Sequence, residues 1–180
     1  DRSPSRGLGD VYKRQRQRGE VRPESVSDGP EPDDRSPTRS ARRRAREFAL
    51  QGLYQWLVAQ TDVAMIEAQI VVLPEFERSD TDLFRSILRG VIQEAATLHK
   101  TIVPLIDRPL IQLSPVEHAA ILIGAWEFSH APETPYRVVI NEAVEIAKSF
   151  GGTDGYRYVN GVLDKVAARL RPTERPNGRV

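Results

Sequence analysis

Apolar residues recur every three to four positions from Ser40 to Leu170, and this spacing constrains the fold more than any other feature of the chain. Such a period places the apolar side chains on one face of an α-helix. No segment shows the alternation of apolar and polar residues that marks a half-buried β-strand. We therefore predict an all-α protein that folds as a compact helical bundle.

Prolines, glycines and capping residues divide the pattern into separate helices. The expected starting points are Ser40, Thr61 or Asp62, residues 79–82, Ser114, Thr134, and Thr153 or Asp154. The third helix is expected to run without a break to Ile102. Ser114 and Glu117 form a capping box, with Pro115 at the first helical position. The helix that follows is apolar on nearly every side over residues 119–128, so we expect it to be the central buried helix.

Composition divides the chain into three parts. Residues 1–40 contain five Pro, six Ser and four Gly and few apolar residues. Burial of so few apolar side chains cannot compensate for the conformational entropy that the segment would lose on folding, so we predict a disordered tail. Because the chain starts at Asp1, its first fifteen or so residues are expected to be a remnant of cloning or sequence assembly. Residues 41–172 form the predicted helical domain, and residues 173–180 a flexible C-terminus.

Several classes of protein and site are disfavoured by the sequence. It has no cysteine, which excludes disulfides, thiol nucleophiles and Cys-based zinc sites. The three histidines lie far apart along the chain, so no metal site is expected. There is no phosphate-binding loop and no nucleophile elbow, and we expect neither an enzyme nor a cofactor. The absence of a long apolar run or a signal peptide predicts a cytoplasmic protein with no membrane partner.

Positive charge is concentrated at the expected start of the first helix. Four arginines lie there: Arg42, Arg43, Arg44 and Arg46. Cations near a helix N-terminus oppose the macrodipole, and Glu47 can relieve only part of that repulsion. Because guanidinium groups bind phosphate bidentately, we predict a local docking point for a phosphate-bearing ligand. The alternative is a solvated charge cluster where the tail meets the folded domain.

Three blocks of sequence resemble the transcription antitermination factor family NusB. The first consists of Ala41–Glu47 (ARRRARE) and Leu53–Trp56 (LYQW), and it resembles the arginine-rich motif of that family. The second is Pro135–Gly151 (PYRVVINEAVEIAKSFG), and the third is Tyr158–Lys165 (YVNGVLDK). The blocks occur in the family's order, and the resemblance covers residues from about 41 to 172.

This resemblance implies two small helical subdomains packed together and a role in RNA binding. The ligand would be the boxA element of single-stranded RNA, bound as a heterodimer with the ribosomal protein NusE. RNA polymerase and other Nus factors would complete an assembly that suppresses termination, chiefly on ribosomal RNA operons. Some relatives also form homodimers. The positions that match the family's RNA-binding residues are Arg42, Arg43, Arg44, Arg46, Phe150, Asp154 and Tyr158, while Tyr54 and Glu117 match the NusE side.

Several of these residues also have a purely structural interpretation. Phe150 falls on the apolar face of its helix and could be a core residue, or it could stack on an RNA base beside Tyr158. Asp154 is either a helix N-cap or a carboxylate that meets base amino groups. Glu142 and Glu145 are interpreted as a solvated helix edge that pairs with Lys148. The two tryptophans are assigned to the core.

Two other functions remain open from the residues. The chain could be the N-terminal RNA-binding part of a ribosomal-RNA cytosine methyltransferase, since a NusB-like domain precedes the catalytic domain of those enzymes. It could also be a helical module whose arginines meet an acidic protein partner.

Overall fold

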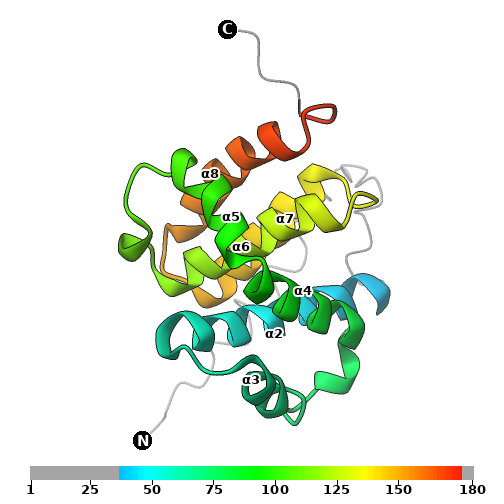
Figure 1. The fold of residues 1–180 in the computed structure, drawn as a ribbon. Coiled ribbons are helices and arrows are strands. Elements are labelled where there is room, and N and C mark those ends of the chain that lie inside the picture. The colour runs from blue at the N-terminus through cyan, green and yellow to red at the C-terminus, as the bar shows by residue number, and fades with distance from the viewer. Residues whose placement is uncertain (1–36, 176–180) are drawn as a thin grey trace, which may run out of the picture. The chain divides into compact units, whose positions relative to one another are not determined.

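Seven α-helices and three short 3-10 turns make up the part of the chain that the computed structural model describes, residues 37–175 (Figure 1). The α-helices are α2 (Pro37–Ala59), α3 (Val63–Ile70), α4 (Thr81–Gln93), α5 (Ala95–Ile102), α6 (Pro115–His130), α7 (Tyr136–Phe150) and α8 (Gly155–Leu170). The 3-10 turns are η1 (Phe76–Arg78), η2 (Val103–Leu105) and η3 (Leu110–Gln112). No strand occurs within these residues, which confirms the all-α prediction. None of the described helices is long and apolar enough to span a bilayer. The predicted tail before residue 37 lies outside the described residues.

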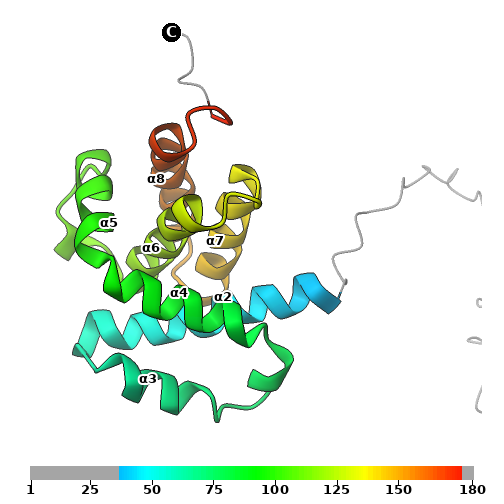
Figure 2. The ribbon, with the colours of Figure 1, turned by 45° about the vertical axis from the view of Figure 1, so that its right-hand side comes forward.

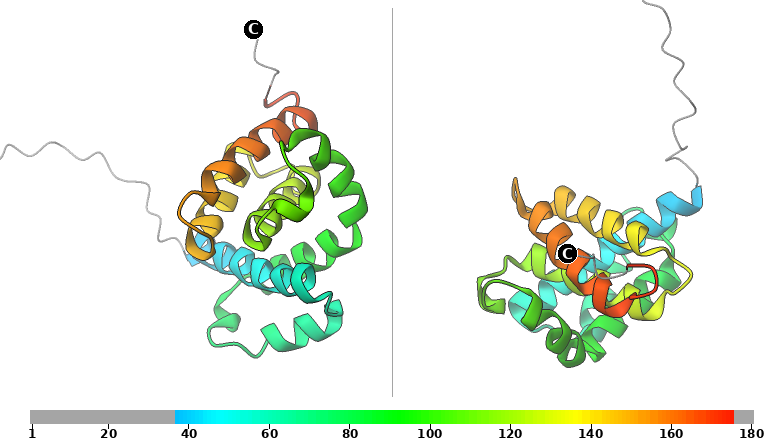
Figure 3. Two further views of the ribbon diagram at one scale, coloured as in Figure 1. Left: turned by 90° about the vertical axis from the view of Figure 1, so that its left-hand side faces the viewer. Right: turned by 90° about the horizontal axis from the view of Figure 1, so that it is seen from above.

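Helix α6 lies at the centre of the fold, as its apolar sequence predicted. Every residue from Ala119 to Phe128 is buried. Helices α2, α4, α5, α7 and α8 all pack against α6, which occupies the middle of a ring of helices in the left view of Figure 3. Helices α2 to α4 form one group and α5 to α8 the second, and both contribute to one hydrophobic core. Helix α2 runs along the boundary between the two groups (Figure 2).

The first helix departs from the prediction at its start. Helix α2 already includes Pro37, so Ser40 is an internal helical residue and not the N-cap. Its hydroxyl accepts a hydrogen bond from Nη1 of Arg44 at 2.8 Å. Residues 37–40, which composition assigned to the tail, are held by a tertiary contact, because Arg39 lies 3.9 Å from Glu142 of α7. The arginine cluster therefore occupies the second and third turns, where the macrodipole effect has largely decayed.

A second departure is the division of residues 79–102 into two helices. Helix α4 ends at Gln93, and α5 begins at Ala95. The intervening Glu94 has φ −101° and ψ 11°, outside the helical region, and its carboxylate lies 2.8 Å from Nε2 of His130 in α6. No proline or glycine occupies position 94, so the sequence carries no local sign of the break.

Most other boundaries confirm the predicted caps. Asp62 accepts a hydrogen bond from the Ala64 amide at 3.1 Å and begins α3. Ser114 accepts from the Glu117 amide at 3.1 Å, as a capping box requires. Helix α8 begins after Asp154, although the Asp154 side chain makes no capping hydrogen bond.

The buried C-terminal end of α6 is satisfied by Arg171. Its guanidinium donates to the carbonyls of Phe128 at 2.7 Å, Ala131 at 2.8 Å and Thr134 at 3.1 Å. Carbonyl groups at the end of a helix and in the turn that follows it have no hydrogen-bond partner within the helix. Arg171 also pairs with Glu174, whose other carboxylate oxygen accepts from the Tyr136 amide at 3.0 Å. Glu174 therefore connects the chain after α8 to the start of α7.

A charged pair lies inside the core between α2 and α6. Arg46 and Glu127 are only 4% and 1% exposed, and three hydrogen bonds of 2.8 to 3.1 Å join the two side chains. A second carboxylate oxygen, from Glu142 of α7, lies 3.8 Å from Nη1 of Arg46. Burial of an unpaired charge is strongly unfavourable, so each of these groups depends on the others.

We expect Glu127→Gln to lower the free energy of unfolding by about 3 kcal/mol, because it leaves the buried Arg46 with Glu142 as its only carboxylate partner. Urea denaturation would measure the loss. A matched control is Glu75→Gln, which removes the exposed pair with Arg78 at 3.3 Å and should cost less than about 0.5 kcal/mol. Equal losses in the two variants would contradict a structural role for the buried pair.

Two histidines that are distant in sequence come together where α5 packs on α6. The Nε2 atoms of His99 and His118 lie 2.8 Å apart, so one ring donates a hydrogen bond to the other. Burial, assisted by the charge of His99, lowers the pKa of His118 from 6.5 to about 4. Burial also lowers the pKa of His99. The folded state therefore favours the neutral pair.

The free energy of unfolding should consequently fall as the pH drops from about 6.5 toward 4. In this range His118 is protonated in the unfolded chain but remains neutral in the folded one. Above pH 6.5 the contribution is complete. We expect a loss of about 1–2 kcal/mol by pH 4.5, discounted for the solvent that reaches the ring. Urea midpoints across this range would measure it, and His118→Gln should flatten the curve. An unchanged curve in that variant would assign the pH dependence to other groups.

Candidate nucleic-acid interface

Three of the four predicted arginines lie at the surface of α2. Arg42, Arg43 and Arg44 are all partly exposed. Arg42 makes no hydrogen bond or ion pair with any residue in the range 37–175, whereas Arg44 donates to Ser40. Arg43 is 27% exposed, and its Nε and Nη2 both lie 3.3 Å from carboxylate oxygens of Glu142. We call these three partly exposed, consecutive arginines the arginine surface.

Arg46 is not part of the arginine surface. The core pair with Glu127 occupies its guanidinium and leaves the side chain almost fully buried. The position was detectable in the sequence, because Arg46 precedes the buried Ala49, Leu50 and Leu53 by three, four and seven residues. Those intervals place it on the buried face of α2.

Glu142 is the counter-charge of this region and was wrongly assigned to a solvated helix edge. Its side chain is 4% exposed and approaches three guanidinium groups, those of Arg39 at 3.9 Å, Arg43 at 3.3 Å and Arg46 at 3.8 Å. The other half of that interpretation is confirmed, since Glu145 pairs with Lys148 at 3.4 Å. Arg39, which sequence reasoning missed, lies one helical turn before Arg43 on the same side of α2.

A row of polar side chains leads from the arginine surface along α2. Arg43, Glu47, Gln51 and Tyr54 are separated by four, four and three residues, so they share one helix face. Burial raises the pKa of Glu47, against the opposing effect of Arg43 and Arg44. From Arg43 to Tyr54 the row covers about 16 Å at the rise of an α-helix.

Two aromatic side chains meet at the far end of this row. Phe150 is 40% exposed and Tyr54 is 43% exposed. Both line a hollow of about 390 Å³ whose other walls come from α2 and from Val116 of α6. The interpretation of Phe150 as a core residue is therefore wrong, because its side chain is exposed. Tyr54, expected on the NusE side, and Phe150, expected on the RNA side, share one site.

Tyr158 contacts the segment between α5 and α6. Its hydroxyl donates to Oδ1 of Asp107 at 3.2 Å, and the Arg108 guanidinium lies 4.3 Å from its ring centre. Burial and the bond to Asp107 raise the pKa of Tyr158, which keeps the hydroxyl protonated. Among the described residues no ring contact joins Tyr158 to Phe150.

Glu117 and Asp154 flank the start of α8. A Cβ atom at Gly155 would lie 2.6 Å from Oε1 of Glu117, so only glycine allows this carboxylate to approach so closely. A negative charge there is favourable at the positive end of the α8 macrodipole. Asp154 is exposed and lies 3.8 Å from Arg157. Glu117 belongs to the same end of α6 as Val116, which connects it to the aromatic hollow.

Comparison with known proteins relates this arrangement to one family. The NusB family model matches residues 43–168. The transcription antitermination protein NusB of Burkholderia lata is 57% identical over 136 residues, which cover 76% of this chain and 94% of the relative. The protein of the same name from Ralstonia nicotianae is 54% identical over 140 residues, covering 78% of this chain and 90% of the relative.

A solved structure agrees with these sequence matches. NusB of T. maritima superposes with a TM-score of 0.64 at 28% identity, and the match covers 74% of this chain and 94% of that one. The family model spans the arginine surface from Arg43 onward, Phe150 and Tyr158. The chain therefore belongs to the NusB family of transcription antitermination proteins.

Proposed function

We propose that this protein is a non-enzymatic transcription factor that binds boxA-type single-stranded RNA through the arginine surface. The observation that carries the proposal is the placement of Arg42, Arg43 and Arg44 on the exposed side of α2. The rest of the chain from residue 49 onward has more acidic than basic residues, so positive potential is focused here. Binding would release counterions from the RNA, and affinity would fall with salt.

Glu142 would adjust this surface without blocking it. Because it approaches Arg39 and Arg43 from the buried side, the guanidinium groups keep donors directed outward. A phosphate would complete a sandwich in which each arginine lies between an internal carboxylate and an external anion. Such preorganisation lowers the entropic cost of fixing long side chains on binding.

The exposed aromatics would contact bases. Phe150 offers a ring face at the hollow beside α2, and Tyr158 offers a second contact beside Arg108. Stacking of an unpaired base on such rings contributes about 1–3 kcal/mol. The exposed carboxylate of Asp154, between these sites in sequence, would repel phosphate and favour base amino groups.

A protein partner, NusE, would bind next to this RNA surface. Tyr54 lines the hollow from α2, and Glu117 follows Val116, the residue that α6 contributes to it. Directly beyond them, Leu57, Val58, Ile111 and Pro115 line an apolar groove of about 410 Å³, and Ile111 is almost fully exposed. Apolar surface of this kind, with polar residues around it, is typical of protein interfaces. With RNA polymerase and other Nus factors the complex would act on ribosomal RNA operons in the cytoplasm.

Arg42 can be removed without breaking a contact among residues 37–175. Arg42→Ala should weaken binding of a boxA RNA about 5- to 20-fold at low salt and reduce the slope of log K against log salt by about 0.7. Filter binding at several salt concentrations would measure both. Arg78→Ala, an exposed arginine on η1 that pairs with Glu75, is the matched control and should change neither.

Unchanged affinity and slope in Arg42→Ala would contradict the proposed surface. If an acidic peptide displaced the RNA and bound more tightly than it, the arginines would instead belong to a protein-binding module.

NusE is the proposed protein partner. Added NusE should tighten RNA binding about tenfold or more, because the complex presents a larger contact surface than either protein. Tyr54→Ala should lower the affinity for NusE while leaving RNA binding by the isolated protein within about threefold, since one truncated interface aromatic costs about 2 kcal/mol or more. Calorimetry with NusE alone, followed by RNA titration, separates the two effects. Failure of NusE to bind the wild-type protein would remove the partner from the proposal.

A further inference from the structure

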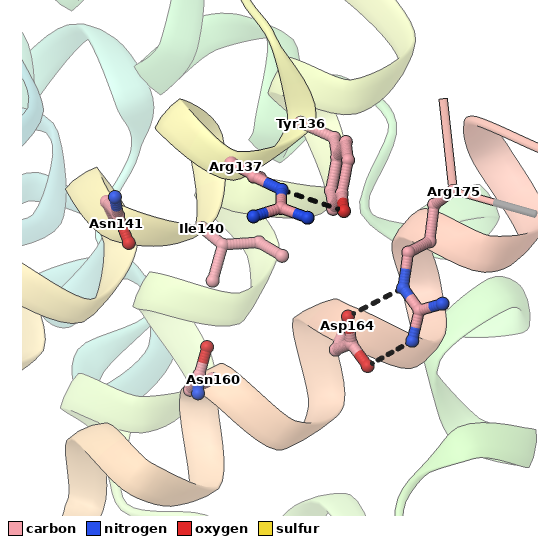
Figure 4. A pocket seen from close by; sticks show the side chains of 7 residues that line it. All are labelled: Tyr136, Arg137, Ile140, Asn141, Asn160, Asp164 and Arg175. Carbon is pink, nitrogen blue, oxygen red and sulfur yellow. Dashed lines mark hydrogen bonds and ion pairs between the residues drawn. The ribbon is translucent and has the colours of Figure 1, made fainter. Parts of the chain in front are cut away.

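We propose that a polar cleft between α7 and α8 is a subsite for one unpaired nucleotide of the RNA, lying beyond the arginine surface. This inference rests on the RNA-binding function proposed above. The cleft has a volume of about 430 Å³, and its walls come from the first half of α7, the middle of α8 and the residues after α8 (Figure 4). It is separate from the hollow at Phe150, which shares none of its lining residues.

The floor and one wall of the cleft suit a nucleobase. Ile140 provides an apolar floor that is nearly buried, and the ring of Tyr136 stands beside it. Unpaired bases of RNA bind by stacking on aromatic rings and guanidinium planes, with their edges hydrogen-bonded to polar side chains. The cleft therefore offers a place where one base can leave solvent.

Two carboxamides supply groups for the base edge. Asn141 of α7 and Asn160 of α8 lie on opposite sides of the cleft in Figure 4. Within residues 37–175 neither side chain has a hydrogen-bond partner. Each amide offers two donors and one acceptor, a combination that pairs with complementary edges of bases.

The charges of the cleft leave one positive group for a phosphate. Arg175 and Asp164 neutralise each other through two hydrogen bonds of 2.9 Å, and this contact lowers the pKa of Asp164. Among residues 37–175, Arg137 donates a hydrogen bond only from Nε, to the Tyr136 hydroxyl at 3.1 Å, and its guanidinium carbon lies 5.7 Å from the Tyr136 ring centre. Its terminal nitrogens remain for an anion, so the net charge of the cleft matches one phosphodiester.

The cleft is continuous with the arginine surface across α7. Asn141 lines the cleft, and the next residue, Glu142, meets Arg39 and Arg43 on the other flank. The exposed ridge between the flanks carries Val138. Along α7 the order is then the cleft, the arginine contacts and, at the C-terminal end, Phe150. An RNA strand that follows this helix meets all three in turn.

The test compares two RNAs, a short boxA element and the same element extended by a few nucleotides at either end. Wild-type protein should bind one extended RNA about tenfold more tightly, as one additional stacked base allows. The variant Asn141→Ala/Asn160→Ala should lose this gain and bind the short RNA within about twofold of wild type. Arg137→Ala should lower the salt slope by about 0.7 for that extended RNA alone.

The matched control is Gln69→Ala/Gln93→Ala, which removes two exposed carboxamides from α3 and the end of α4 and should retain the full gain. Retention of the gain in the asparagine variant, or an equal loss on short and extended RNA, would overturn the cleft assignment. The same holds if wild type gains nothing from either extension. If wild type binds neither RNA, the RNA-binding function itself fails, and this subsite with it.

Discussion

The contact between Arg46 and Glu127 determines how α2 presents the rest of its arginines. Three hydrogen bonds inside the core fix the rotation of α2 about its axis relative to α6. Arg42 and Arg43 precede Arg46 by four and three residues, one helical turn, so the core pair also fixes where these two arginines lie on α2. One basic motif therefore has two tasks: a single buried member orients the helix, and its neighbours form the surface.

Glu142 joins these two tasks. As part of α7 it lies 3.8 Å from the buried Arg46 and 3.3 Å from the half-exposed Arg43. Glu142 thus connects the buried pair of Arg46 and Glu127 to the partly exposed Arg43. A carboxylate so deeply buried is tolerable only because several guanidinium groups surround it. The negative charge of Glu142 in turn offsets the mutual repulsion of the arginines around it.

The sequence predicted local structure well and tertiary charge contacts poorly. Helical period, the caps at Asp62 and Ser114, and the buried segment 119–128 depend on neighbouring residues, so they could be predicted. The break at Glu94 and the start of α2 before Ser40 coincide with contacts to side chains of α6 and α7, which have no local signature. Arg46 lies between these cases. Its spacing to Leu50 and Leu53 marked it as buried, but a charge run was easier to interpret as surface.

The position of the arginines within α2 determines which groups can hold an anion there. The arginines lie in the second and third turns of α2, so neither the macrodipole nor unpaired amides of a helix end can hold a phosphate there. In the proposed complex, attraction would come from the guanidinium groups themselves, and Glu142 orients the one of Arg43. Since such contacts act on phosphates of any sequence, they give affinity and register. In the proposed complex, discrimination between bases would come from elsewhere along α7, where the aromatic hollow and the polar cleft lie at opposite ends of the same helix.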